Sequence, residues 1–124
     1  MSMAVVYTDL DGTLLDHYTY AFDKALETIK ALKAQGIPIV PCTSKTRTET
    51  VSLMQALELD NPMIIENGAA IWVPDDWGLT RPEGADIDVD ANAWSHCFSP
   101  PRGMIRRQLA ILNIEWGNRY QSLC

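Results

Sequence analysis

The sequence contains no long hydrophobic run: no stretch of its 124 residues approaches the roughly 20 consecutive apolar residues that a membrane helix needs. Basic residues are in the minority, since ten lysines and arginines stand against sixteen acids and the net charge is −6 at pH 7. Such a charge repels a phosphate backbone. The sequence therefore predicts neither a membrane span nor a nucleic-acid partner.

Cysteine is also scarce. Cys42, Cys97 and Cys124 are an odd number without CxxC spacing, which argues against a disulfide framework or a zinc site and predicts free thiols. The first residues lack a basic segment ahead of a long apolar run, which predicts a cytoplasmic location. A hydrophobic fraction of 47% with 21% charged residues is typical of a globular chain, and the length fits one domain.

Short apolar runs alternate with helical periodicity over the first half of the chain. Residues 4–8, 37–42 and 63–65 have the composition of buried strands. A helix is predicted over 22–34, and a second one begins at Thr46, which has capping-box spacing to Glu49. This order predicts an α/β fold with a partial Rossmann-like parallel sheet, followed by a hairpin return over 70–73.

The remaining residues divide by charge. Residues 74–98 are rich in acids, proline and glycine and predict an exposed acidic connecting loop. Ser99 and Pro100 are a typical helix start, and Ile105, Leu109, Leu112 and Trp116 then recur on one face. Residues 99–124 carry four bases and one acid, against six bases and fifteen acids before them. We therefore divide the chain into units 1–73, 74–98 and 99–124.

The strongest functional signal is the pair Asp9 and Asp11, which follows the first strand directly. Ligands bind beyond the carboxyl ends of strands in open parallel sheets. Two carboxylates there can share a divalent cation, and Gly12 allows a tight turn beside a phosphate. Asp9 can then attack phosphorus, while Asp11 protonates the leaving alkoxide and later deprotonates water. The alternative is an acidic turn that only caps a helix.

Two further loops follow the second and third strands. Thr43, Ser44 and Lys45 offer hydroxyls, turn amides and an ammonium to phosphoryl oxygens, although Ser44 could merely cap the next helix. Asn67 and Gly68 end the third strand, and this pair equally favours a two-residue hairpin turn. All three loops are expected along one rim of the sheet.

The string DLDGTLLD at residues 9–16 resembles motif I of the haloacid dehalogenase superfamily of aspartate-nucleophile phosphatases. Together with CTSKT and IIENGAAI, it is similar to the mannosyl-3-phosphoglycerate phosphatase group. The resemblance implies a Mg²⁺-dependent phosphatase for a small phosphorylated sugar or glycerate derivative, with the metal at Asp9 and Asp11. It further implies phosphate or substrate contacts at Leu10, Gly12, Thr13, Thr43, Ser44, Lys45, Asn67 and Gly68.

The same resemblance implies a later lysine and later acidic magnesium ligands beyond a cap domain. No lysine follows Lys45 and no acid follows Glu115, and residues 99–124 look like the beginning of the cap. We therefore expect a truncated chain with impaired turnover. The alternatives are a noncatalytic module that binds magnesium, phosphate or another chain, and a sugar phosphomutase.

Two expectations concern surfaces. Arg102, Arg106 and Arg107 cluster on the last helix and either recognise an anionic substrate or form solvated surface. The resembling fold places its first strand centrally, with the second and third strands on one side and later strands on the other. Without the later strands this strand becomes a sticky edge, which predicts a homodimer or larger assembly.

Overall fold

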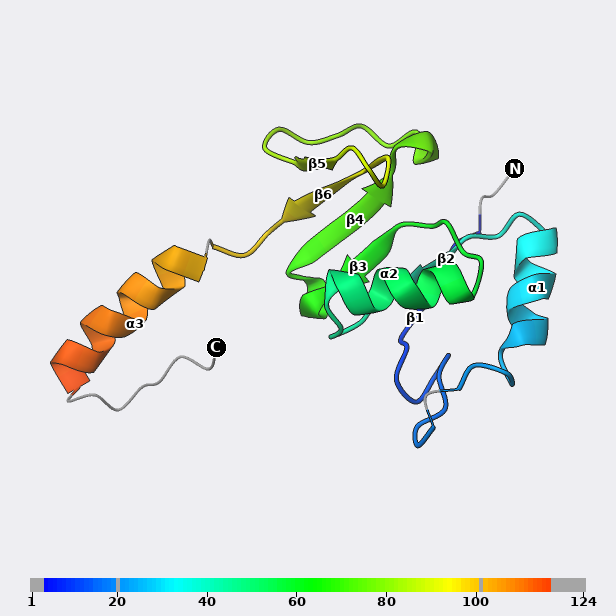
Figure 1. Cartoon of the computed structure of the whole chain (residues 1–124), viewed down its shortest axis with the longest axis horizontal. Coiled ribbons are helices and arrows are strands. Elements are labelled where there is room, and N and C mark those ends of the chain that lie inside the picture. The colour runs from blue at the N-terminus through cyan, green and yellow to red at the C-terminus, as the bar shows by residue number, and fades with distance from the viewer. Residues whose placement is uncertain (1–3, 20, 101, 117–124) are drawn as a thin grey trace.

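The computed structural model describes residues 4–19, 21–100 and 102–116. Its strands and helices alternate first and are followed by an antiparallel region and a final helix (Figure 1). In chain order these are β1 (Val6–Thr8), α1 (Leu26–Ala34), β2 (Ile39–Pro41), α2 (Arg47–Ala56), β3 (Met63–Ile65), β4 (Ala70–Pro74), β5 (Asp86–Asp88), β6 (Ala93–Cys97) and α3 (Arg102–Trp116).

The strands follow one another side by side. β1 pairs in parallel with β2, with Val6 opposite Ile39, and a parallel bridge between Cys42 and Ile64 continues from β2 to β3. β3, β4, β6 and β5 then pair in that order as an antiparallel sheet. The predicted α/β class with parallel strands is confirmed.

The core lies between the helices and strands β2 to β4. Ile29 of α1 and Met54 of α2 pack in one cluster with strand residues Ile39, Met63 and Ile65, all of them buried. The second helix begins at the predicted capping box: the Glu49 carboxylate accepts the Thr46 hydroxyl at 2.6 Å and the Thr46 backbone N–H at 3.0 Å. Both bonds lower the pKa of Glu49, and the bond from the Thr46 hydroxyl has the larger effect.

The prediction that residues 74–98 form only a connecting loop is wrong, because this segment contains two strands. β5 and β6 form there, and Val73 of β4 lies opposite the buried Trp94 of β6. The acids that suggested a loop belong in part to an edge strand: Asp86 and Asp88 are on β5, whose second side is free of any described strand. Charged side chains on such an edge oppose further strand pairing.

The last helix, α3, extends away from the sheet (Figure 1). It forms after the predicted start at Ser99 and Pro100. The predicted apolar stripe of this helix begins with Ile105, which is 42% exposed. The structure does not describe the other three side chains of the stripe, which are Leu109, Leu112 and Trp116. Within the described part of the chain, none of the helices combines the length and the apolar composition needed to cross a bilayer.

Candidate functional site

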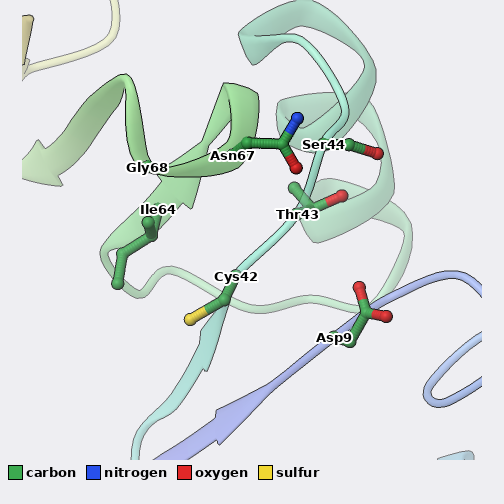
Figure 2. A pocket seen from close by; sticks show the side chains of 7 residues that line it. All are labelled: Asp9, Cys42, Thr43, Ser44, Ile64, Asn67 and Gly68. Atoms are coloured by element: carbon green, nitrogen blue, oxygen red, sulfur yellow. The ribbon is translucent and has the colours of Figure 1, made fainter.

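Three loops at the carboxyl ends of β1, β2 and β3 surround a pocket of about 510 Å³. Asp9 comes from the first loop, and its carboxylate lies across the pocket from the β3 loop (Figure 2). The structure thus brings together residues that the sequence places more than fifty positions apart. The full lining is Asp9, Cys42, Thr43, Ser44, Ile64, Asn67 and Gly68.

The β1 loop is anchored by Leu10, whose side chain is fully buried. The Leu10 carbonyl accepts the N–H groups of Thr13 at 3.2 Å and Leu15 at 2.8 Å, and the Leu10 N–H donates to Asp9 Oδ1 at 2.8 Å. These hydrogen bonds to the buried Leu10 form a tight turn, and Asp9 is exposed at the start of the loop. Leu10 therefore has only its backbone to offer a ligand.

Gly12 and Thr13 line a different pocket, of about 490 Å³, together with His17 and Lys24. Gly12 has a φ of 75°, which is the left-handed region. A Cβ at Gly12 would also lie 3.4 Å from His17 Nδ1. The glycine is thus required by the turn, and the structure does not bring Gly12 and Thr13 to the pocket of Asp9.

The β2 loop holds Thr43 and Lys45 by backbone and side-chain bonds. Thr43 is 4% exposed, and its backbone N–H donates to the Ile64 carbonyl at 2.9 Å. Its Oγ1 accepts the Lys45 N–H at 3.1 Å. Ser44 is exposed beside it and lines the same pocket. Thr43 is therefore fixed in position at the carboxyl end of β2.

The β3 loop differs from the predicted two-residue turn. Ile65 lies opposite Ala70, so residues 66–69 connect the two strands. Glu66, Asn67 and Gly68 have φ values of 52°, 57° and 84°, three successive left-handed residues. The loop closes on itself where the Ala69 N–H donates to the Glu66 carbonyl at 3.1 Å, and it also bonds to the β2 loop, because the Asn67 N–H donates to the Thr43 carbonyl at 2.9 Å. The β2 and β3 loops consequently form one wall.

Asp11 and Lys45 form an ion pair, with Lys45 Nζ 3.1 Å from Asp11 Oδ1. Neither lines the 510 Å³ pocket. The side chains are 21% exposed for Lys45 and 38% for Asp11. The sequence indicated both residues separately but gave no signal that they meet.

Cys42 lines the pocket, although the sequence indicated only a free thiol there. It is a free cysteine, and its half-buried side chain lies between β2 and Thr43. Burial raises the pKa of the Cys42 thiol, and the negative charge of Asp9 raises it further. The thiol is therefore neutral at pH 7, and it serves as a small, weakly polar wall of the pocket.

The donor set at the β1 loop fits a magnesium ion. No group of three or more His, Cys, Asp or Glu residues within the described ranges could hold a metal. However, Asp9 is exposed, whereas Asp11 Oδ1 faces the Lys45 ammonium at 3.1 Å, so Asp9 is the carboxylate of this pair that remains open to a cation. Mg²⁺ takes oxygen ligands and usually keeps several waters, so one or two carboxylates are sufficient.

The arginines of α3 are not brought to the pocket. Arg106 and Arg107 are exposed on a helix that extends away from the three loops (Figure 1), and the side chain of Arg102 lies outside the described ones. The arrangement favours the solvated-surface interpretation of this cluster.

Residues 6–81 match the family of haloacid dehalogenase-like hydrolases. The chain belongs to this family. The match begins at β1 and includes all three loops of the candidate site, so the matched range contains every residue that lines the pocket.

Two curated relatives are phosphatases by name. A glucosyl-3-phosphoglycerate/mannosyl-3-phosphoglycerate phosphatase of Methanococcoides burtonii is 49% identical over 72 residues, which are 58% of this chain and 26% of that relative. A phosphatase of the same name from Persephonella marina is 46% identical over 70 residues, which are 56% of this chain and 26% of that relative. The chain spans about a quarter of the length of these relatives in each match.

Two solved structures share the fold. A hypothetical protein of Geobacillus kaustophilus superimposes with a TM-score of 0.60 at 22% identity, covering 94% of this chain and 38% of that one. A phosphatase of the superfamily from Bacteroides thetaiotaomicron gives a TM-score of 0.61 at 22% identity, with 93% and 36% covered. These likenesses extend to the region of β4 to β6 because they cover nearly the whole chain.

Proposed function

We propose that this chain contributes the nucleophile and the phosphate-binding wall of a magnesium-dependent phosphatase for small phosphorylated sugar or glycerate derivatives. The observation that carries the proposal is the position of Asp9, which lies across one pocket from Thr43 and Asn67. The similarity to two glycosyl-3-phosphoglycerate phosphatases supports the substrate class.

The reaction begins when a carboxylate oxygen of Asp9 attacks the phosphorus of the monoester. A bond forms between Asp9 and phosphorus while the bond to the substrate oxygen breaks, and Asp11, after taking up a proton from solvent, gives that proton to the leaving alkoxide. Asp11 then takes a proton from water, the water oxygen attacks phosphorus, and Asp9 and inorganic phosphate are released. Mg²⁺ at Asp9 and the Asp11 backbone carbonyl would offset the charge of the phosphoryl oxygens.

The wall formed by the β2 and β3 loops would hold the transferring group. The Thr43 hydroxyl accepts the Lys45 N–H and retains its own hydrogen to donate to a phosphoryl oxygen. Asn67 offers a side-chain amide from the β3 loop. The N-terminus of α2 contributes less than expected from the sequence, because the Glu49 carboxylate already occupies it.

A substrate panel tests this function. We expect magnesium-dependent phosphate release from mannosyl- or glucosyl-3-phosphoglycerate to exceed release from p-nitrophenyl phosphate, and to stop when EDTA removes the metal. We expect slow turnover for the 124-residue chain alone, because residues 46–124 contain no lysine to brace the phosphate. Binding of phosphate without any release would favour the noncatalytic module, and transfer of the phosphoryl group to a sugar acceptor instead of water would favour the phosphomutase.

We also propose that the chain self-associates through β1. Among the described strands, β1 pairs with β2 only. Val5, which precedes β1, is 37% exposed, and Tyr7, within β1, is 65% exposed. An unpaired apolar edge is a template for another strand. Sedimentation velocity at micromolar concentration should show a dimer or larger species, and Tyr7→Lys should shift it toward monomer. A wild-type chain that sediments only as a monomer would contradict this proposal.

A further inference from the structure

Lys45 is bonded to all three loops of the candidate site. Its backbone N–H donates to Thr43 Oγ1 at 3.1 Å within the β2 loop. Its carbonyl accepts the Glu66 N–H of the β3 loop, also at 3.1 Å. Its ammonium reaches the β1 loop, 3.1 Å from Asp11 Oδ1. The backbone of Lys45 is therefore held by hydrogen bonds, while its long side chain connects the β2 loop to the β1 loop.

The contact with Asp11 is of a kind that a stronger anion can replace. Asp11 Oδ1 is buried and accepts no well-aligned hydrogen bond from the described residues, so the contact with Lys45 is held by charge more than by direction. Both side chains keep some exposure to solvent, and such partly exposed pairs are weak. A phosphoryl group carries up to two negative charges against the one of Asp11 and therefore attracts the ammonium more strongly.

Lys45 also lies next to the phosphate-binding wall. It directly follows Thr43 and Ser44, both of which line the pocket. With its backbone held in place, rotation about side-chain bonds is enough to carry the ammonium from Asp11 toward the pocket, since a lysine stem has four carbons. The motion requires no rearrangement of the loops.

We propose that Lys45 exchanges between two anions: it pairs with Asp11 when the pocket is empty and with the phosphoryl group when the pocket is filled. The exchange rests on the proposed function and assigns Lys45 a positioning role for Asp11. In the empty site the ammonium keeps the Asp11 carboxylate at the buried side of the loop. A bound phosphoryl group draws the ammonium away and frees the carboxylate to turn to the leaving oxygen.

The test is a double-mutant cycle on the affinity for inorganic phosphate, measured by calorimetry on the full chain at a fixed magnesium concentration. The variants are Asp11→Asn, Lys45→Met and both together. We expect Lys45→Met to weaken phosphate binding by about tenfold. Asp11→Asn should tighten phosphate binding. The gain in affinity should be about fivefold larger in the wild-type background than in the Lys45→Met background, because only a lysine at position 45 is released from Asp11 by this change.

Two controls separate the exchange from a general charge effect. Lys30→Met removes one positive charge from the exposed face of α1, where Lys30 pairs with Glu27 at 3.7 Å, and should leave phosphate affinity and the Asp11→Asn effect unchanged. Lys45→Arg keeps the charge and should restore the coupling. Asp11→Ser replaces Asp11→Asn if circular dichroism shows that the asparagine variant is misfolded.

The outcomes distinguish the exchange from the function on which it rests. If wild-type protein binds phosphate and Asp11→Asn has the same fold effect with and without Lys45, the exchange is overturned and the proposed function stands. If wild-type protein binds no phosphate at all, the proposed function and the exchange both fail. A fivefold coupling that Lys45→Arg preserves and Lys30→Met does not disturb supports the exchange.

Discussion

Replacing Asp9 by asparagine should lower any magnesium-dependent phosphate release by roughly 10⁴-fold and abolish the covalent phosphoenzyme. The amide has the shape of the carboxylate but is a poor nucleophile and carries no charge for the metal. Asp9 is exposed at the pocket, and its contact with the Leu10 N–H can be kept by the amide oxygen, so folding should be preserved. Acid quenching followed by mass spectrometry detects the phosphoryl adduct.

The matched control is Asp23→Asn. Asp23 is an exposed aspartate ahead of α1 and lies outside the pocket of Asp9, so its replacement changes the net charge equally without touching the site. This control should keep the wild-type rate and the adduct. If Asp9→Asn retained turnover and only lost affinity for magnesium, Asp9 would be a metal ligand and another group would be the nucleophile.

The second large effect concerns stability. Ile39→Ala should lower the free energy of unfolding by about 2 to 5 kcal/mol, which is the usual cost of this truncation in a core. Ile39 is 2% exposed, lies opposite Val6 of β1 and belongs to the main hydrophobic cluster. Because it positions the strand that carries Thr43, the same variant should also weaken phosphate binding. Urea unfolding followed by circular dichroism measures the loss.

Ile87→Ala is the control for this prediction. Ile87 has the same side chain on edge strand β5 but is 58% exposed. Its truncation should change the free energy of unfolding by less than about 0.5 kcal/mol. Equal urea midpoints for the two variants would show that β2 is not at the centre of the folded chain.

The sequence predicts the β1 to β3 region well because local signals there agree with the burial that follows. The run around Ile39 and Val40 is apolar on both faces, and both residues are buried. Thr46 and Glu49 have a local pattern that needs no tertiary information, and they form the capping box as expected. The carboxyl ends of parallel strands meet at one edge, so the positions of Asp9 and Thr43 follow from strand order alone.

The acid content of residues 74–98 indicates a loop and so does not reveal strands β5 and β6. On a sheet edge, acids such as Asp86 and Asp88 mark the unpaired strand, and the buried Trp94 of β6 is the residue of this segment that indicates a packed strand.

Long-range contacts account for the other differences. The β3 loop bonds to Thr43 and Lys45, residues more than twenty positions earlier, and these bonds override the two-residue turn that Asn67 and Gly68 favour locally. The meeting of Lys45 with Asp11 is likewise a consequence of how the loops fold together. Neither contact has a periodicity or spacing by which a sequence could reveal it.

The most direct test of the phosphoryl site is a crystal structure of the chain with magnesium and beryllium fluoride, which mimics a phosphoryl group on an aspartate. We expect beryllium bound to a carboxylate oxygen of Asp9, fluorides facing Thr43 and the β3 loop, and magnesium at Asp9 and the Asp11 carbonyl. Beryllium fluoride on another carboxylate, with the pocket of Asp9 and Thr43 empty, would contradict this expectation.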